Sequence, residues 1–380
     1  MCAGAQWSLP AGFDGDWTAL IAPSHILRAV TAPARGRAFV TGASGQDGYF
    51  LLRLLVEQGW RVDAFARRTD AVRADFGDRV DVHPFELLEP TSFFRRIAED
   101  KPDEIYNLAG QSSVARSITE PLETWSTNAD FVVRLLETVR HASPESRLYQ
   151  ASSIEMLGGV PGGAIRHDES SPLAPRTPYA AAKAAAHLLC GAYREQFNLR
   201  VACGIISNHE SHRRGPYFLS RKIADHVAAL MRSREMPPLS VGNLLVARDW
   251  GFAECYAEGI VRVLRQAQLR SIPDEGRNYR DYILATGRSH AVWQMIDAAF
   301  RAGGFELRWH LDRENHAASH AVFADGRLAV RTDPAFLRNA EPLVIEADPQ
   351  RARQDLGWTP RSDVGAIFTD MLQHAGAAVA

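Results

Sequence analysis

The stretch RAFVTGASGQDGYFLLRLLVEQG, residues 37–59, decides the fold. Its first part, RAFVTG, is a short apolar run that predicts a buried strand. Its last part, YFLLRLLVEQG, has leucines at helical spacing and predicts a helix that ends at Gly59. Between the two lies a short, glycine-rich connection. A strand, a glycine loop and a helix in this order are typical of a nucleotide-binding α/β unit.

The three glycines of this loop, TGASGQDG (41–48), each have an expected task. Gly42, Gly45 and Gly48 follow the spacing G-x-x-G-x-x-G, which is looser than G-x-G-x-x-G. We expect Gly42 to allow the sharp turn, Gly45 to let the backbone approach a pyrophosphate, and Gly48 to let the helix pack closely on the strand. The helix N-terminus would supply N–H donors to the anion. The alternative is a purely structural turn.

The end of the next expected strand, RVDAFARR (61–68), indicates which dinucleotide binds. Enzymes that prefer NAD usually carry an acid there, which holds the ribose 2′-hydroxyl. This strand instead ends in Arg67 and Arg68, and Asp63 lies too early in it. Two guanidinium groups suit a 2′-phosphate, so the sequence favours NADP. The alternative is a pair of solvated arginines.

Strands and helices continue to alternate along the first 200 residues. Strands are expected at 61–68, 79–87, 103–110 and 146–153, and helices at 92–101 and 129–142. Such alternation predicts an α/β fold with a doubly wound parallel sheet. After about residue 205 the pattern is irregular apart from a helix at 218–233. We expect a nucleotide-binding domain at 37–207 and a smaller, discontinuous α/β substrate-binding domain within 208–375, with some segments returning to the main sheet; residues 1–36 are an extension.

Composition excludes several classes of protein. The chain has 380 residues, of which 46% are hydrophobic and 23% charged, and a net charge of −2. No overall field attracts nucleic acid or a membrane surface. No apolar run is long enough to span a bilayer and no secretion signal is evident. The four cysteines form no CxxC pair, which favours free thiols in the cytoplasm, and we expect no metal site.

A tyrosine and a lysine four residues apart indicate redox chemistry. PYAAAK (178–183) places Tyr179 and Lys183 on one face at the start of a helix. The ammonium group is expected to lower the pKa of the phenol, which would make Tyr179 a proton carrier. Alone, this spacing is common by chance and favours two surface residues. With the glycine loop and a strand ending in Ser153, it resembles the short-chain dehydrogenase/reductase superfamily with its Rossmann sheet, in the branch that modifies nucleotide sugars.

Glu155 narrows the chemistry further. It lies among apolar and small residues in YQASSIEMLG (149–158), two residues past Ser153. The resemblance implies the glutamate that serves the sugar-nucleotide 4,6-dehydratases of this branch as the base at C5 of the hexose. An acid in such apolar surroundings is expected to have a raised pKa, which suits proton transfer. The alternative is a glutamate that caps the turn before Gly158.

Several longer segments are similar to GDP-mannose 4,6-dehydratases. They are YNLAGQSSVARSITEP (106–121), NHESHRRGPYFLSRKIA (208–224), VGNLLVARDWGFAECY (241–256), DYILATG (281–287) and DLGWTPR (355–361). The resemblance runs from about Arg37 to about Ala375. It implies a GDP-mannose-like substrate and a homodimer or homotetramer.

The resemblance also assigns further binding residues. For the coenzyme it adds Gln46, Asp47, Glu86, Leu108, Ala109, His209 and Arg214 to the glycines, the two arginines, Tyr179 and Lys183. For the sugar nucleotide it implies Ser112, Asn208, Lys222 and Arg248. Arg213 and Arg214 are also candidates for the diphosphate, with exposed loop arginines as the alternative.

Two departures leave other functions open. Ile154 stands where the family has serine, and Leu157 replaces the usual tyrosine. Isoleucine cannot hydrogen-bond the departing C6 hydroxyl. Glu155 could both take the C5 proton and return one to the leaving oxygen. The alternatives are an NADP-dependent 4-epimerase or reductase of another nucleotide sugar, and a non-catalytic nucleotide-sugar-binding protein.

Overall fold

The computed structural model of the chain describes residues 35–159, 162–233, 235–337, 341–361 and 363–375. Residues from Ala34 onward form one compact unit. Except for Arg35 and Gly36, the expected N-terminal extension lies outside the described residues.

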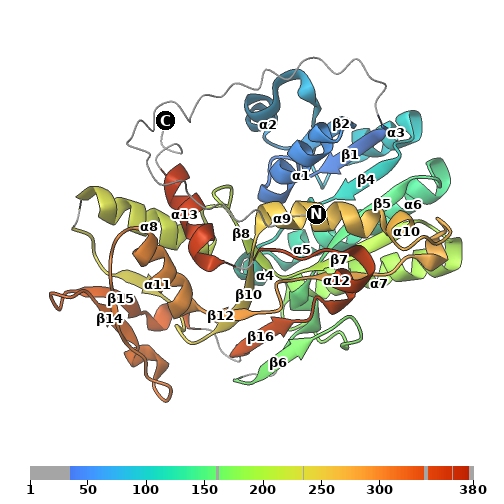
Figure 1. The fold of residues 1–380 in the computed structure, drawn as a ribbon. Helices are drawn as coiled ribbons and strands as arrows, with labels where there is room; N and C mark the ends of the chain where they lie inside the picture. The colour runs from blue at the N-terminus through green and yellow to red at the C-terminus, as the bar shows by residue number, and fades with distance from the viewer. Residues whose placement is uncertain (1–34, 160–161, 234, 338–340, 362, 376–380) are drawn as a thin grey trace, which may run out of the picture. The chain divides into compact units, whose positions relative to one another are not determined.

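A seven-stranded, all-parallel sheet forms the larger part of this unit (Figure 1). Its order is β3-β2-β1-β4-β5-β7-β11, which confirms the expected doubly wound sheet. The strand order reverses between β1 and β4, and ligands of such sheets bind beyond the carboxyl ends at that point. The strands are β1 (Arg37–Thr41), β2 (Arg61–Ala66), β3 (Asp81–Pro84), β4 (Glu104–Asn107), β5 (Arg147–Ser153), β7 (Val201–Ile206) and β11 (Tyr282–Leu284).

Helices cover both faces of this sheet. One core cluster joins it to α1 (Gln46–Glu57), α2 (Thr69–Phe76), α9 (Ala253–Leu264) and α12 (Gln350–Leu356). Another joins its opposite face to α3 (Thr91–Asp100), α6 (Phe131–Ala142) and α7 (Pro178–Phe197). The short helices α4 (Val114–Thr119) and α5 (Pro121–Trp125) pack on α7, and α10 (Gln266–Leu269) follows α9. The strands of residues 37–153 and the helices α1, α3 and α6 match the expected elements, whereas the sequence did not indicate α2, α4 or α5.

Two smaller sheets and three helices form the other part, drawn at the left and bottom of Figure 1. One sheet has the order β12-β10-β16-β6, with β8 beside β10: β6 (Ala164–His167), β8 (Asn208–Glu210), β10 (Ala247–Phe252), β12 (Ser289–Ala291) and β16 (Val344–Ala347). The other contains β9 (Leu239–Val241), β13 (Arg308–His310), β14 (His320–Val322) and β15 (Leu328–Thr332). Their core includes α8 (Leu219–Ser233), α11 (Val292–Ala302) and α13 (Val364–His374).

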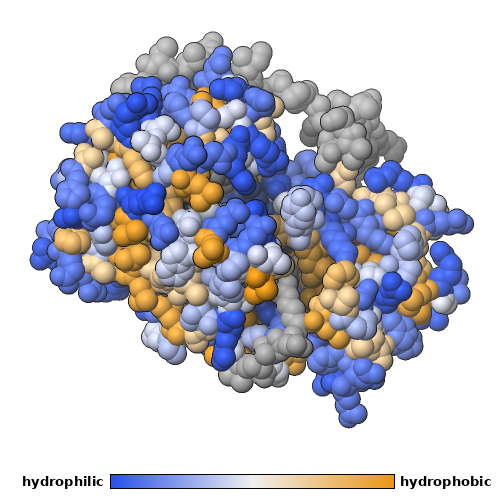
Figure 2. Space-filling view, turned by 180° about the vertical axis from the view of Figure 1, so that it is seen from behind, coloured by the Kyte–Doolittle hydropathy of each residue, from blue (hydrophilic) through white to orange (hydrophobic). Residues whose placement is uncertain are grey.

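The chain passes between the two parts more than once. β11 and α9 follow residue 208 in sequence but pack in the main sheet and on its face, whereas β6 precedes residue 208 and pairs with β16. The proposed domain boundary at 207 stays a prediction. Viewed from behind, the surface is hollowed between the two parts (Figure 2). None of the described helices is long and apolar enough to cross a membrane.

Candidate active site

The glycine loop between β1 and α1 leaves no room for side chains at two positions. Gly42 has a φ of 70°, and a Cβ there would lie 2.9 Å from the Ala109 nitrogen. A Cβ on Gly48 would lie 2.7 Å from the Ala43 Cα and would collide with the Gly42 carbonyl, so α1 packs directly on the loop. Gly45 precedes α1 and offers no side-chain cap. The N–H groups at the N-terminus of α1 therefore have no side-chain acceptor at the cap, and the predicted role of this turn in binding an anion stays a prediction.

Hydrogen bonds tie the first turn of α1 to the segment after β7. Asp47 Oδ1 lies 2.8 Å from His209 Nε2, and the Gln46 amide donates to the His209 carbonyl at 2.9 Å. Ser211 Oγ donates to Gln46 Oε1 at 2.9 Å. Burial opposes both charges, but the ion pair holds the pKa of Asp47 below and that of His209 above its ordinary value. These contacts therefore hold the glycine loop in place through Gln46, Asp47 and His209.

The end of β2 presents its two arginines to solvent. Arg67 and Arg68 are both exposed, and Arg68 Nη2 donates to the Ser44 carbonyl of the glycine loop at 3.2 Å. Asp63 is fully buried and contacts Arg37, His83 and Arg96. Burial raises its pKa, but these partners hold it well below its ordinary value. Asp63 is therefore a structural anion, and the two residues that follow β2 are both arginines.

Glu155, the predicted base, lies on a tight turn directly after β5. Ser153 is the last residue of the strand, and its Oγ accepts a hydrogen bond from the Glu155 backbone at 3.3 Å. Ile154 and Leu157 point into a satellite core and are only 4% exposed. Glu155 is half-buried and remains the one polar side chain of the turn Ile154–Leu157. The two departures from the family pattern therefore fill a hydrophobic cluster.

Tyr179 and Lys183 lie in the first turns of α7, opposite that turn. Thr177 caps the helix by accepting from the Ala180 nitrogen, and Pro178 occupies its first position. The Tyr179 hydroxyl is hydrogen-bonded to Ser153, and the charge of Glu155 acts on the same phenol. Lys183 Nζ donates to the Ala151 carbonyl at 2.9 Å and lies 6.0 Å from the centre of the Tyr179 ring. All four predicted catalytic residues thus converge.

The protonation of this pair differs from the expected one. Burial raises the pKa of Tyr179 to about 12, although the Ser153 hydrogen bond acts in the opposite direction. Burial also lowers the pKa of Lys183 to about 8. The expectation that the Lys183 ammonium lowers the phenol's pKa is therefore wrong, because the lysine is itself desolvated and bonded to a carbonyl.

Asn128 is a polar residue at the site that the sequence did not reveal. It lies in a π-helical turn, Ser126–Asp130, and is 2% exposed. Its Nδ2 donates to the Gln111 carbonyl at 2.8 Å, whereas its Oδ1 has no partner among the described residues. A Cβ on Gly110 would collide with that Oδ1 and lie 3.7 Å from Lys183 Nζ. Asn128 therefore supports the loop after β4. The surrounding sequence TNAD contains no pattern that indicates this role.

The remaining coenzyme candidates border the same edge of the sheet. Leu108 and Ala109 follow β4 and face the glycine loop at Gly42. Glu86 follows β3 and is exposed. Arg214 forms an ion pair with the buried Glu210 at 2.9 Å and lies over the Phe218 ring. The coenzyme roles of these residues stay predictions.

Arg213 has a different set of contacts. It binds Asp75 of α2 through two hydrogen bonds of 2.8 and 2.6 Å and lies over the Tyr49 ring. These contacts account for its charge without a ligand, so it serves here as a bridge between α2 and the loop after β8.

The substrate candidates lie on several elements. Ser112 is exposed and Asn208 half-buried. Lys222 on α8 donates to the Ser240 carbonyl at 2.7 Å and lies over the Phe336 ring. Arg248 on β10 donates to the Pro342 carbonyl at 3.2 Å, and Pro342 packs against Gly159 beside the catalytic turn. Arg248 is thus near Glu155's segment, and the assignments of all four stay predictions.

Asp249, next to Arg248, holds the loop after β11. It is 3% exposed and accepts from Ser207 Oγ, Thr286 N and Gly287 N at 3.2, 2.9 and 2.7 Å. Burial raises its pKa despite these bonds. The buried acid of the segment 241–256 is therefore a structural clamp at the carboxyl edge of β7 and β11.

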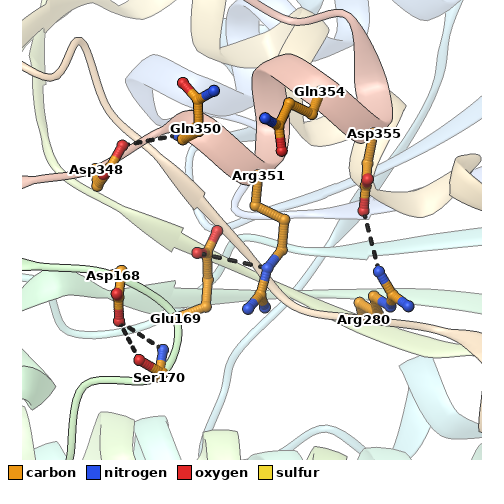
Figure 3. A pocket seen from close by; sticks show the side chains of 9 residues that line it. All are labelled: Asp168, Glu169, Ser170, Arg280, Asp348, Gln350, Arg351, Gln354 and Asp355. Carbon is orange, nitrogen blue, oxygen red and sulfur yellow. Dashed lines mark hydrogen bonds and ion pairs between the residues drawn. The ribbon is translucent and has the colours of Figure 1, made fainter.

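A separate pocket of about 330 Å³ contains none of the predicted site residues (Figure 3). Its inner wall is Glu169, which accepts from the Ile283 nitrogen at 2.9 Å and lies 3.6 Å from Arg351 Nε. At its rim Arg280 approaches Asp355 at 3.5 Å. Glu169 thus occupies the free edge of β11, and the acids and arginines drawn are paired with one another or with backbone. This pocket is structural rather than reactive.

Solved structures share this fold. RMD from Pseudomonas aeruginosa, complexed with NADPH, matches with a TM-score of 0.70 and 21% identity over 90% of this chain and 100% of that one. A dTDP-glucose 4,6-dehydratase from Bacillus anthracis, in complex with NAD, matches with a TM-score of 0.69 and 18% identity over 90% and 97%. At these identities the likeness shows the fold alone.

Sequence relatives are more informative. A GDP-mannose 4,6-dehydratase of Yersinia enterocolitica is 33% identical over 88% of this chain and 92% of its own length. One of Drosophila melanogaster is 32% identical over 88% and 85%. The family model for GDP-mannose 4,6 dehydratase matches residues 39–371, from β1 into α13. The chain therefore belongs to the GDP-mannose 4,6-dehydratase family.

Proposed function

We propose that this chain is a hydro-lyase that converts GDP-mannose to GDP-4-keto-6-deoxymannose. The observation that carries the proposal is the convergence of Ser153, Glu155, Tyr179 and the buried Lys183 in a chain that matches the dehydratase family from residue 39 to residue 371. Nothing in this arrangement requires a metal ion, because each proton has a side chain to receive it.

The residues at the sheet edge fit NADP. Gly42 and Gly48 form a cradle that a Cβ would fill, the first turn of α1 has no side-chain cap, and exposed Arg67 and Arg68 end β2. Arg68 already reaches the glycine loop, where a 2′-phosphate would lie next to both guanidinium groups. Bound NADP would supply the hydride acceptor and donor that the reaction needs.

The protein's own groups perform the proton transfers. Tyr179 takes the proton of the C4 hydroxyl, and Ser153 hydrogen-bonds the same oxygen. Oxidation at C4 makes the neighbouring C5 hydrogen acidic, and Glu155 removes it. Ile154 and Leu157 are buried in an apolar cluster and cannot donate a proton. Glu155 therefore also returns a proton to the departing C6 oxygen, which leaves as water. The hydride removed at C4 ends at C6, and C5 takes up a proton from solvent in place of the proton that the C4 hydroxyl gave to Tyr179. The sugar therefore loses one water and undergoes no net redox change.

A mass-spectrometric assay tests this proposal. The full chain is incubated with GDP-, UDP-, dTDP- and CDP-hexoses, each with NADP or NAD added. We expect loss of one water from GDP-mannose, in reactions supported best by NADP. Unchanged mass with a new stereoisomer would establish an epimerase instead. Binding of NADP and GDP-mannose with no turnover would establish a non-catalytic binding protein.

We further propose that the chain forms a homodimer through α4, α5 and α7. Four large hydrophobic side chains on these adjacent helices are exposed by 45 to 83%: Ile118, Leu122, Trp125 and Leu188. Exposed apolar clusters of this kind favour association. A cytoplasmic location is supported by Cys190, Cys203 and Cys255, which are buried free thiols.

A further inference from the structure

Three metal-ligating side chains meet on the side of the fold where α13 contacts the loop after β8 (Figure 1). His212 comes from that loop, and Asp370 and His374 come from consecutive turns of α13. One nitrogen from each histidine and one carboxylate oxygen lie within 4.8 Å of one another. No local pattern indicates the cluster, since His212 and Asp370 are 158 residues apart.

The distances match a coordination sphere. His212 Nδ1 lies 3.0 Å from Asp370 Oδ2, and His374 Nδ1 lies 3.5 Å from Asp370 Oδ1. With zinc–ligand bonds of about 2.0–2.1 Å, neighbouring ligands of a tetrahedral ion are about 3.3 Å apart. The two histidine rings are stacked at 4.0 Å, and His374 Nδ1 is hydrogen-bonded to the Asp370 carbonyl at 2.8 Å, so the exposed His374 ring must rotate for both histidines to face one ion. Two imidazoles and one carboxylate are a donor set that zinc prefers.

The carboxylate of the cluster is held in place, and one of its histidines is open to solvent. The His212 backbone nitrogen donates to Asp370 Oδ2 at 2.9 Å and fixes the carboxylate. His374 is 49% exposed, which gives an ion access from solvent and leaves a position for water.

We propose that His212, Asp370 and His374 bind a divalent transition-metal ion of the zinc class as a structural clamp. A second cluster of potential metal ligands, which consists of His187, Cys203 and Asp281, is not suited to bind a metal ion. In it Asp281 is bound by Arg194 at 2.8 and 2.7 Å, and Cys203 is fully buried. The Arg194 guanidinium already neutralises that carboxylate, whereas Asp370 contacts no arginine or lysine among the described residues.

The clamp would act on the coenzyme side of the fold. The loop that carries His212 also carries His209 and Ser211, which bond to Asp47 and Gln46 at the start of α1. A metal at His212 therefore ties α13 to the segment that supports the glycine loop. An ion that binds the folded chain more tightly than the unfolded chain raises its stability with concentration.

Metal binding to the full, untagged and metal-stripped chain tests the proposal. Zn²⁺ is titrated by competition with a chromophoric chelator, and Co²⁺ is followed by its visible absorption. We expect one ion per chain, with affinity reduced at least about 100-fold in His212→Ala and in His374→Ala. The matched control is His310→Ala, from a pair in which His310 stacks on His320 at 4.7 Å with no carboxylate in the same cluster.

A second measurement separates the site from a simple ion pair. Zn²⁺ should raise the Tm of the wild type and of His310→Ala, and should leave that of His374→Ala unchanged. Because His374 is half exposed in the last turn of α13, its replacement does not threaten folding. Absence of stoichiometric binding, or equal binding by wild type and His374→Ala, would overturn the proposal. Dehydratase activity is not the readout, so the two proposals fail independently.

Discussion

Glu155 is the residue on which the proposed chemistry depends most. It is the one acid of its turn, and its neighbours Ile154, Met156 and Leu157 are buried. Glu155→Gln keeps the size of the side chain but cannot accept the C5 proton. We expect turnover of GDP-mannose to fall about 100- to 10,000-fold, the usual contribution of one proton-transfer group. Exchange of the C5 hydrogen with deuterated solvent should fall in parallel, as mass spectrometry would show.

The matching control for Glu155→Gln is a charge change away from the site. Glu275→Gln removes an exposed partner of Arg277 and should leave turnover and exchange unaltered. NADP should bind equally to all three proteins, because Glu155 does not border the glycine loop. Full activity of Glu155→Gln would remove the proposed base and with it the mechanism.

Lys183 illustrates the cost of a functional charge. It is 7% exposed, and burial lowers its pKa from 10.5 to about 8. The unfolded chain then binds the proton more tightly, so this group's contribution to the free energy of unfolding rises with pH between about 8 and 10.5. Relative to Lys183→Met, the wild type should gain about 2 to 3 kcal/mol between about pH 7 and pH 10.

Urea unfolding of the two proteins at both pH values measures this difference. The lost hydrogen bond to Ala151 shifts both values together and does not change the trend. Lys101→Met, a change at the end of α3, should show no pH-dependent difference from wild type. A constant difference for Lys183→Met would mean that this lysine is not desolvated.

At the scale of elements, the contact between α1 and the glycine loop determines whether the coenzyme site exists. A methyl group on Gly48 would lie 2.7 Å from Ala43 Cα and strike the Gly42 carbonyl, and both are backbone. We expect Gly48→Ala to destabilise the chain by about 1–3 kcal/mol and to weaken NADP binding, measured by urea unfolding and fluorescence titration.

A second glycine-to-alanine change isolates this effect from helix propensity. Gly191 lies within α7, and a Cβ there would meet only Arg194 Nη2, at 3.7 Å. Gly191→Ala should stabilise the chain by about 0.5–1 kcal/mol and leave NADP binding unchanged. Equal effects of the two substitutions would contradict the proposed close approach of α1.

The elements themselves were largely predictable because their signals are local. Apolar runs and leucine spacing identified β1, α1, β2 and α3, and the roles assigned to Gly42 and Gly48 agree with the space around them. Helix α2 escaped notice because TDAVRADF is short and has only Val72 and Phe76 as buried apolar residues. The pKa of Tyr179 was wrongly predicted because spacing gives the distance between two residues but not their burial.

Across the whole molecule, long-range pairing was not predictable from one sequence. The sequence suggested that segments return to the main sheet, but not that β11 forms its edge or that β8 pairs with β10. Such pairings depend on contacts between residues far apart, which no local periodicity encodes. The same limit applies to Asn128, whose importance comes from Gly110 and Lys183, and to His212, whose partners lie on α13.

Assembly is the largest-scale property that the surface predicts. Leu122 and Leu188 are exposed by 83 and 61% on α5 and α7, next to Ile118 and Trp125, and burying such a patch against a second copy would remove it from water. We expect sedimentation velocity to show a dimer for the wild type. Leu122→Glu should raise the dissociation constant at least about 30-fold, the loss of about 2 kcal/mol typical of one central residue. Leu269→Glu, at an exposed leucine of α10, should remain dimeric, since it lies outside the patch. A monomeric wild type, or dimers of equal strength in all three proteins, would show that this patch is not the interface.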